Sequence, residues 1–409
     1  MIQANHLNSD FFDTADGVLL INGQPVDALA REYGTPFYAY DKSVIERRYK
    51  LLRDALPSRI DIHFAMKANP MPEVVHQLAE LVDGIDIASG GELRIATQTS
   101  CPREEMSFAG PGKSLAEIEL AVQSGIVLNA ESKLEIERIS SVADALDVRA
   151  AVAVRVNPDF ELKNSGMRMS GGPKQFGIDA EQVPEVLQSW PKQLNFEGFH
   201  IFTGSQNLNA ESIVAAQQNS YALAMELAAH APNDPRFLNL GGGFGIPYFP
   251  GDADLDLAPI AQCLATLDED LQARFPECHI VIELGRYLVG ECGVYVCEVV
   301  DLKESRGVNF AVTNGGLHHH LAASGNFGQI LRKNYPVLVA NKADLPAEQT
   351  ATVVGPLCTP LDLLGDKVNV PELQVGDLIA VMQSGAYGYT ASPHLFLSHG
   401  APQEIFCGD

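Results

Sequence analysis

The sequence has few basic residues for its length. Its 409 residues include 28 Lys and Arg against 52 Asp and Glu, which gives a formal net charge of −24 at pH 7. Because this charge repels polyanions, neither nucleic acid nor an anionic membrane is expected as a partner. No apolar run approaches the about 18 residues of a membrane span, and residues 1–10 lack the pattern of a signal peptide. We therefore expect a cytoplasmic protein.

Metal and nucleotide motifs are also missing. The seven cysteines are scattered without a Cys-x-x-Cys pair, so neither a disulfide framework nor a zinc site is expected. The run His318–His320 does not change this, because adjacent strand residues point to opposite faces and no Cys or carboxylate stands at ligand spacing nearby. Gly112–Ser114 lacks the upstream glycine of a P-loop, and Gly241–Gly245 lacks the third glycine of a dinucleotide fingerprint. Nucleotide binding is not expected.

The chain instead shows a long alternation of short β-rich runs and amphipathic helical stretches. Strand candidates are residues 36–40, 60–64, 84–88, 106–109, 126–129, 148–156, 196–202 and 237–240. Eight strand–helix units in about 240 residues are typical of a (β/α)8 barrel. A doubly wound open sheet is the alternative α/β fold.

The alternation ends near residue 279. Residues 294–300, 309–312, 349–354 and 377–382 read as strands with few helices between them, which predicts a mostly β domain. We expect a barrel domain over residues 35–278, with residues 1–34 joining residues 279–409 in the β domain. A chain of this length is also too long for one ordinary core.

One lysine stands out against this background. The segment Asp61–Pro70 places Lys67 at the end of an otherwise apolar strand. Burial there would lower the pKa of the ammonium towards a nucleophilic free amine, the chemistry of a Schiff-base lysine. The alternative is a strand-end lysine that reaches solvent along its aliphatic stem.

Other polar residues follow the remaining predicted strands. In a barrel, the residues after the carboxyl ends of the strands face the active site. Read in order, they are Lys67, Asp86 with Ser89, Glu131, Arg155 with Asn157, His200, Gly241–Gly243 and Glu283–Arg286. The glycine run can bring backbone N–H groups close to a phosphate, although glycine clusters also make plain turns.

Taken together, seven ordered motifs resemble the fold-type III pyridoxal-phosphate decarboxylases, the family of diaminopimelate and ornithine decarboxylases. The motifs are Thr35–Asp41, Phe64–Asn69, Gly84–Leu93, Leu238–Gly245, Glu283–Arg286, Gly355–Asp362 and Gly385–Tyr387. The resemblance implies a TIM-like barrel with a C-terminal β domain and pyridoxal 5'-phosphate (PLP) as cofactor. It also implies decarboxylation of an amino acid, a lyase reaction of amino-acid metabolism.

The resemblance also implies a role for each matched residue. Lys67 would hold PLP as an imine, and Glu283 would face the pyridine nitrogen and keep it protonated. His200 would stack on the ring, with Asp86 close to the cofactor. The remaining cofactor contacts would be Ser205, Gly243, Leu284, Gly285, Arg286 and Tyr387.

On the substrate side, the resemblance implies Arg286, Thr359, Asp362 and Tyr387. Cys358 would come from the partner subunit of a homodimer and protonate the carbanion, so that each active site is shared. A buried core cysteine is the alternative reading of Cys358.

Three departures from the family pattern bear on the substrate. Thr359 stands where the family places a carboxylate for a distal ammonium, and residues 318–327 replace the Arg-Pro-Ala-Leu-Tyr segment that binds a distal carboxylate. The stretch from His200 to Ser205 is two residues longer than usual, which bears on the phosphate role of Ser205. A site that lacks polar partners for a charged distal group loses its preference for that group.

The altered segment, residues 317–328, resembles a divergent branch of the family. That branch includes the glutamyl-carrier-protein decarboxylase of butirosin biosynthesis and exosortase-associated relatives. We expect an α-decarboxylase of an amino acid or aminoacyl substrate, with carrier-bound glutamate as one candidate. Because carrier proteins are acidic, a basic patch would be needed, and Arg332-Lys333 is the candidate. The alternatives are diaminopimelate decarboxylase, a PLP-dependent racemase and a catalytically silent regulatory homologue.

Overall fold

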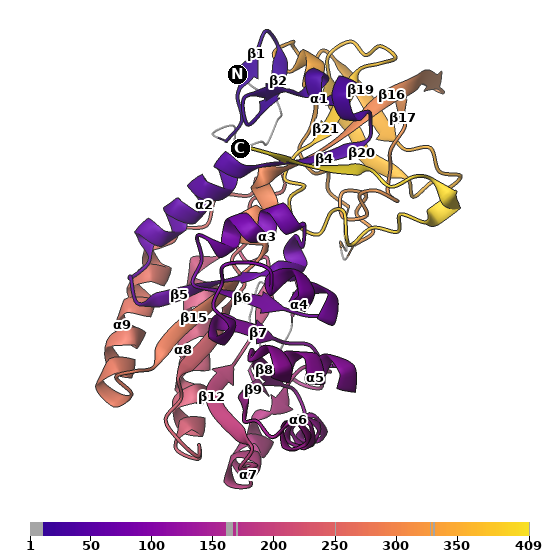
Figure 1. Ribbon diagram of the computed structural model, residues 1–409. Helices are drawn as coiled ribbons and strands as arrows, with labels where there is room; N and C mark the ends of the chain where they lie inside the picture. The colour runs from indigo at the N-terminus through magenta and orange to yellow at the C-terminus, as the bar shows by residue number, and fades with distance from the viewer. Residues whose placement is uncertain are drawn as a thin grey trace. The chain divides into compact units, whose positions relative to one another are not determined.

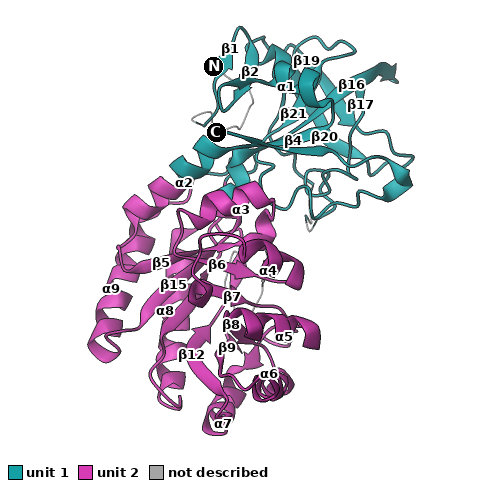
Figure 2. Ribbon diagram, in the orientation of Figure 1, with its two compact units in different colours: residues 1–48, 247–253, 288–409 teal, residues 49–246, 254–287 magenta. Residues whose placement is uncertain are grey.

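The computed structural model describes residues 11–160, 167–168, 171–249, 251–327, 329 and 332–408. The chain forms two compact units. One unit comprises residues 1–48, 247–253 and 288–409, and the other comprises residues 49–246 and 254–287 (Figure 2). Residue 328 of the altered segment lies outside the described residues.

The second unit is a closed parallel barrel, which confirms the predicted fold class. Its eight strands are β5 (Ile60–Ala65), β6 (Gly84–Ile87), β7 (Met106–Phe108), β8 (Val127–Ala130), β9 (Ala150–Asn157), β12 (Leu194–His200), β14 (Phe237–Gly242) and β15 (His279–Leu284). Each pairs in parallel with the next, and β15 pairs with β5 to close the ring. Their near-continuous apolar runs are expected for strands covered on both faces.

Helices lie on the outside of this ring (Figure 1). They are α3 (Pro72–Ala79), α4 (Gly90–Ala96), α5 (Leu115–Ser124), α6 (Lys133–Leu146), α7 (Val183–Gln188), α8 (Ala210–Ala228), α9 (Ala258–Arg274) and part of α2 (Lys42–Ala55). Serine side chains cap three of them, and Ser114 forms a full capping box with Glu117 at the start of α5. Across the described ranges, no helix has the length and apolar character needed to span a bilayer.

The first unit is built on a mixed sheet. Its path runs β18 (Val337–Val339), β21 (Leu378–Val381), β16 (Gly293–Ser305), β17 (Val308–Thr313), β19 (Gln349–Val354) and β20 (Leu363–Val370). A small sheet of β1 (Thr14–Ala15), β2 (Val18–Ile21) and β3 (Gln24–Pro25) precedes α1 (Val26–Tyr33). The predicted β character of this part of the chain is therefore found, and residues 1–34 contribute the strands β1 to β3.

Two strand assignments were wrong. The run at residues 36–40, predicted as the first barrel strand, is β4 (Phe37–Asp41), which pairs with β16 and with β22 (Gln403–Cys407) in the β unit. The eighth barrel strand is β15, beyond the predicted barrel end at residue 278. All five residues of β4 are buried. A fully buried strand has the same apolar sequence pattern in a barrel and in the β unit. The pattern therefore does not specify the strand with which it pairs.

Candidate active site

Lys67 lies in a turn of 3-10 helix, Met66–Ala68, directly after β5. Its Nζ lies 3.6 Å from Oε1 of Glu283, the fifth residue of β15, which pairs with β5. The Lys67 side chain is 44% exposed, so the burial expected from the sequence is wrong. The distinctive feature of Lys67 is the carboxylate beside its amine. The Glu283 side chain is only 5% exposed, so this carboxylate is buried.

The Glu283 carboxylate is held in its ionised form. Burial raises the pKa of this group, but the positive charge of Lys67 and the contact with His200 outweigh burial and hold the pKa well below its usual range. Arg155 acts in the same direction. A carboxylate that stays ionised inside a barrel can hold a proton on a basic nitrogen placed opposite it.

His200 is the last residue of β12, and its Nε2 lies 3.1 Å from Oε2 of Glu283. Its side chain is 2% exposed. Lys67 and His200 thus approach different oxygens of one carboxylate, and both were predicted from the sequence to serve this site.

Asp86 belongs to a buried polar row across neighbouring strands. Its Oδ1 accepts a hydrogen bond from Ser107 Oγ and lies 3.4 Å from His63 Nδ1, while Asn129 Nδ2 donates to Ser107 Oγ at 2.9 Å. Burial lowers the pKa of His63, but the charge and hydrogen bond of Asp86, together with the charges of Asp61 and Glu105, outweigh burial and raise that pKa. Asp86 Oδ2 is buried and finds no hydrogen-bond partner among the described residues.

The glycine loop after β14 lies against the Gly204–Ser205 segment. Gly243 has φ +74°, and a Cβ added there would lie 2.6 Å from Gly204 O and 3.9 Å from Ser205 Cα. Asn207 N donates to Gly243 O at 2.9 Å, which holds the two segments together. Ser205 therefore borders the glycine loop, although the stretch that precedes it is longer than in the family pattern.

This site fits pyridoxal phosphate. The Ser205 Oγ is buried without a hydrogen-bond partner in the described part of the chain, beside a loop that only glycine permits. Gly285 also needs to be glycine, because a Cβ there would lie 2.8 Å from Ala68 Cβ, next to Lys67. An amine for covalent attachment, an ionised carboxylate and an unsatisfied hydroxyl by a glycine cradle are the groups that such a cofactor uses.

Two features of this region, the Glu131–Arg155 ion pair and Phe202, were given no role from the sequence. The Glu131 carboxylate pairs with Arg155 Nη1 at 2.8 Å and accepts hydrogen bonds from Gly110 N and Gly177 N, so it joins three strand-end loops. Lys67 Nζ lies 5.4 Å from the centre of the Phe202 ring. Phe202 follows His200 by two residues, and it closes the predicted strand at residues 196–202, which was the available signal.

Of the other predicted site residues, Leu284 ends β15 and Arg286 begins α10 (Arg286–Val289) in the barrel unit, whereas Cys358, Thr359, Asp362 and Tyr387 belong to the β unit. Cys358 is exposed, in the loop between β19 and β20, and Thr359 follows it partly buried. Asp362 is 3% exposed, and its two oxygens accept hydrogen bonds from Leu317 N at 2.6 Å and Leu357 N at 2.8 Å. This arrangement favours a structural role for Asp362, which joins two loops, over the predicted contact with substrate.

The histidine run is part of the core of the β unit. His320 is fully buried, accepts a hydrogen bond from Ala323 N at Nδ1, and has Nε2 2.9 Å from Ser384 Oγ. Burial lowers the pKa of His320 to about 3, so the ring stays neutral. Within the described ranges, no group of three or more His, Cys, Asp or Glu side chains is placed to hold a metal ion.

Arg332 and Lys333, the candidate basic patch, differ in their contacts and in their exposure. The Arg332 guanidinium donates from Nε to Ser324 O at 3.0 Å and from Nη2 to Leu363 O at 2.8 Å. Arg332 therefore holds backbone carbonyls, and of the pair only Lys333 is exposed.

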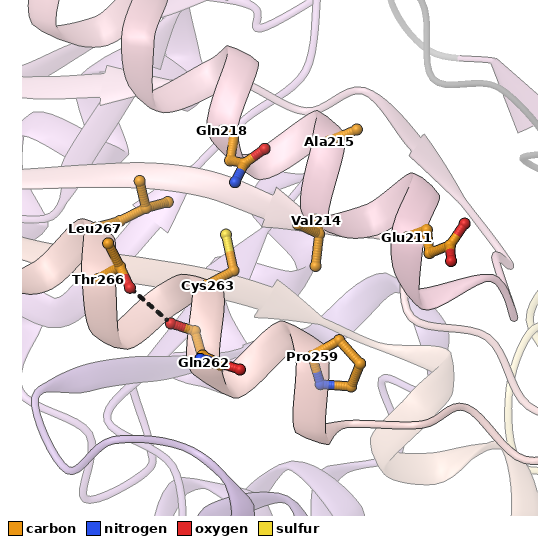
Figure 3. A pocket seen from close by; sticks show the side chains of 9 residues that line it. All are labelled: Glu211, Val214, Ala215, Gln218, Pro259, Gln262, Cys263, Thr266 and Leu267. Carbon is orange, nitrogen blue, oxygen red and sulfur yellow. Dashed lines mark hydrogen bonds between the residues drawn. The ribbon is translucent and has the colours of Figure 1, made fainter.

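A surface groove on the barrel lies away from these residues. It runs between α8 and α9 on the helical exterior (Figure 3) and is lined by residues such as Val214, Pro259, Cys263 and Leu267. None of the predicted site residues lines it.

Comparisons with known proteins agree with this geometry. The family described as pyridoxal-dependent decarboxylase, pyridoxal binding domain, matches residues 42–290. The L-glutamyl-[BtrI acyl-carrier protein] decarboxylase of Niallia circulans is 38% identical, over 93% of this chain and 90% of its own. The diaminopimelate decarboxylase of Aquifex aeolicus is 32% identical, over 94% and 89%. The crystal structure of diaminopimelate decarboxylase from Helicobacter pylori with L-lysine superposes with a TM-score of 0.82 at 28% identity, covering 93% of this chain and 94% of its own.

Proposed function

Because the chain belongs to the pyridoxal-dependent decarboxylase family, we propose that it removes the α-carboxylate from a glutamyl group attached to an acyl carrier protein. Its cofactor is pyridoxal phosphate and its reaction is decarboxylation. The substrate is the part that the proposal adds. The observation that carries it is the neutral Thr359 in the loop where the family pattern has a carboxylate.

The chemistry divides between cofactor and protein. When bound, pyridoxal phosphate supplies the electron sink that accepts the electron pair left as carbon dioxide departs. In the proposal, Lys67 provides the amine for covalent attachment, and Glu283 holds a proton on the ring nitrogen. Ser205, Gly243, Gly285 and Arg286 hold the phosphate, with Leu284 and Tyr387 as further contacts.

Thr359 argues for a neutral distal end of the substrate. Its hydroxyl cannot stabilise a desolvated ammonium, and a buried unpaired charge costs several kcal/mol. Removal of an α-carboxylate requires that group to be free, so a glutamyl substrate must be attached through its side-chain carboxyl. That attachment makes the distal end neutral, which suits a threonine in place of an acid.

The relatives support the same choice. The curated relative that acts on a carrier-bound glutamyl group is 38% identical, whereas the diaminopimelate decarboxylase of Aquifex aeolicus is 32% identical over a similar span. The latter relative makes diaminopimelate decarboxylation the second candidate function.

A decarboxylation screen tests the substrate. We expect carbon dioxide release from carrier-linked glutamate, with meso-diaminopimelate, lysine and ornithine at least about a thousandfold poorer in kcat/KM. Turnover of meso-diaminopimelate at about 10⁴ M⁻¹s⁻¹ or above, typical of a dedicated enzyme, would instead restore the second candidate.

Thr359→Glu is the matched variant for this screen. It should shift preference towards diamino acids, because the new carboxylate can pair with a distal ammonium. Thr350→Glu, on the exposed face of β19 in the same unit, adds the same charge outside the loop and should leave the preference unchanged. An equal shift in both variants would show a general charge effect.

We also propose that two chains share each active site, with Cys358 acting across the interface as the proton donor. The exposure of Cys358 on a single chain supports this, since its thiol is free to meet another chain. A shared site requires a homodimer for activity.

Mixed dimers test the shared site. Inactive Lys67→Ala and Cys358→Ala chains should regain up to about a quarter of wild-type activity when mixed, because half the dimers are hybrids with one intact site of two. Mixing Lys67→Ala with the double variant Lys67→Ala/Cys358→Ala cannot form an intact site and provides the baseline. No recovery above that baseline, despite demonstrated subunit exchange, would place Cys358 in its own subunit's site or outside catalysis.

A further inference from the structure

We propose that His63 is a positioning residue of the cofactor site. Through its contact with Asp86, it determines which oxygen of that carboxylate stays open to the cofactor bound at Lys67. The inference rests on the proposed attachment of pyridoxal phosphate to Lys67. It concerns a buried histidine within β5 to which neither the sequence motifs nor the proposed function assigns a role.

His63 lies between two strands that carry buried carboxylates. It pairs in register with Glu283 of β15 on one side and with Gly84 of β6 on the other. Asp86 follows two residues after Gly84, towards the carboxyl end of β6. The carboxyl ends of barrel strands carry the reacting groups. His63 can therefore act on a strand-end carboxylate without reaching the strand ends itself.

A glycine sets the position of the His63 ring. A Cβ added at Gly84 would lie against His63 Nε2 and 2.5 Å from its Cε1, so the ring occupies the space that a side chain on β6 would need. At the other side of the ring, Nδ1 lies 3.4 Å from Asp86 Oδ1. Nε2 has no hydrogen-bond partner among the described residues. Because a carboxylate accepts hydrogen bonds, Nδ1 is the nitrogen that donates to Asp86.

These contacts make the two oxygens of Asp86 unequal. Oδ1 accepts from His63 Nδ1 and from Ser107 Oγ, whereas Oδ2 is buried without a partner in the described part of the chain. The raised pKa of His63 strengthens its contact, because a protonated ring donates more strongly to a carboxylate. A buried oxygen without a hydrogen bond is costly, so Oδ2 is the atom that a bound group would satisfy. The two donors thus fix the position of Oδ2 before the cofactor binds.

Three substitutions at His63 separate a hydrogen-bond donor from bulk. His63→Asn places an amide near the position of Nδ1, His63→Gln places it near Nε2, and His63→Leu has no donor. The Gln and Leu variants should weaken PLP binding by about 3- to 10-fold, the range of one hydrogen bond, and change the visible circular dichroism of the bound cofactor. His63→Asn should restore both properties towards the wild type. Equilibrium dialysis measures the affinity.

A double-mutant cycle tests whether His63 acts through Asp86. Asp86→Ala removes both oxygens, so adding His63→Leu to it should change PLP affinity by less than about twofold. Ser107→Ala gives an independent route, because it removes the other donor to Oδ1 and leaves His63 in place. It should weaken PLP binding alone and have little further effect in the Asp86→Ala background. If His63→Leu does not fold, this second cycle decides.

His279→Leu is the matched control. His279 Nδ1 lies 3.1 Å from Asp61 Oδ2, which makes a second histidine–aspartate pair on β15 and β5, but at the amino ends of these strands. The control should leave PLP affinity and circular dichroism unchanged. Thermal unfolding of every variant shows whether a change acts through stability.

The inference is overturned if His63→Leu binds PLP as the wild type does, if His63→Asn is no better than His63→Leu, or if the effects within either cycle are additive. Borohydride reduction of the wild-type holoenzyme is done first. Absence of label on Lys67 would count against the proposed attachment, whereas labelled Lys67 with an unaffected His63→Leu variant would count only against the role of His63.

Discussion

Lys67→Ala should abolish both the covalently held cofactor and decarboxylation, while the chain remains folded. The Nζ of Lys67 lies 3.6 Å from the Glu283 carboxylate, so a cofactor attached to this amine would have its ring close to Glu283. Without it the cofactor has no attachment point at this site and the substrate amine has no linkage to exchange with. Borohydride reduction followed by peptide mass spectrometry should label the wild type and leave the variant unlabelled.

Lys133→Ala is the matched control for this experiment. The Lys133 side chain on α6 is 46% exposed and pairs with Glu185 at 2.9 Å, so it resembles Lys67 in exposure and in having a carboxylate partner. It should keep the label and the activity. A borohydride-reducible cofactor in purified Lys67→Ala protein would show that another lysine forms the linkage.

Glu283→Gln should retain pyridoxal phosphate but lose about 10²- to 10³-fold or more in kcat, the cost of removing one preorganised charge from an active site. Gln has nearly the same shape, so packing in β15 should be preserved. The amide cannot keep a proton on the ring nitrogen, and that proton matters most as negative charge develops in the transition state. Single-turnover rates at saturating substrate give the comparison.

Glu283→Asp separates charge from position. It restores a carboxylate on a shorter side chain, so it should recover part of the rate lost in Glu283→Gln while binding the same amount of cofactor. Thermal unfolding of all three proteins shows whether either change acts through stability. An unchanged kcat in Glu283→Gln would mean that a different group faces the ring nitrogen.

Much of the fold could be predicted because barrel strands leave a strong local signal. The predicted runs at residues 60–64, 196–202 and 237–240 correspond to the barrel strands β5, β12 and β14, and the carboxyl ends of these strands carry Lys67, His200 and the glycine loop. The errors fell where local pattern carries no pairing information. Residues 36–40 and 279–284 are both short buried strands, and only their partners, β16 and β5, distinguish the β unit from the barrel.

For the site, the sequence showed which residue types are present, but it did not show their solvent exposure or their hydrogen-bond partners. The sequence identified Lys67 as the candidate Schiff-base lysine. Its expected reactivity depended on burial, but the side chain is 44% exposed. Nor could the sequence show that both oxygens of Asp362, a predicted substrate contact, accept backbone N–H groups from two separate loops. Solvent exposure and hydrogen-bond partners depend on segments far apart in the chain, so no local window contains them.

The sequence by itself determined the family and the cofactor, because these depend on residue types in ordered motifs. Only the tertiary structure decided how Lys67 and His200 meet Glu283. Closure of the barrel through β15 sets one oxygen of the Glu283 carboxylate against Lys67 and the other against His200. That arrangement arises from strand pairing across more than two hundred residues, and no short-range pattern encodes it.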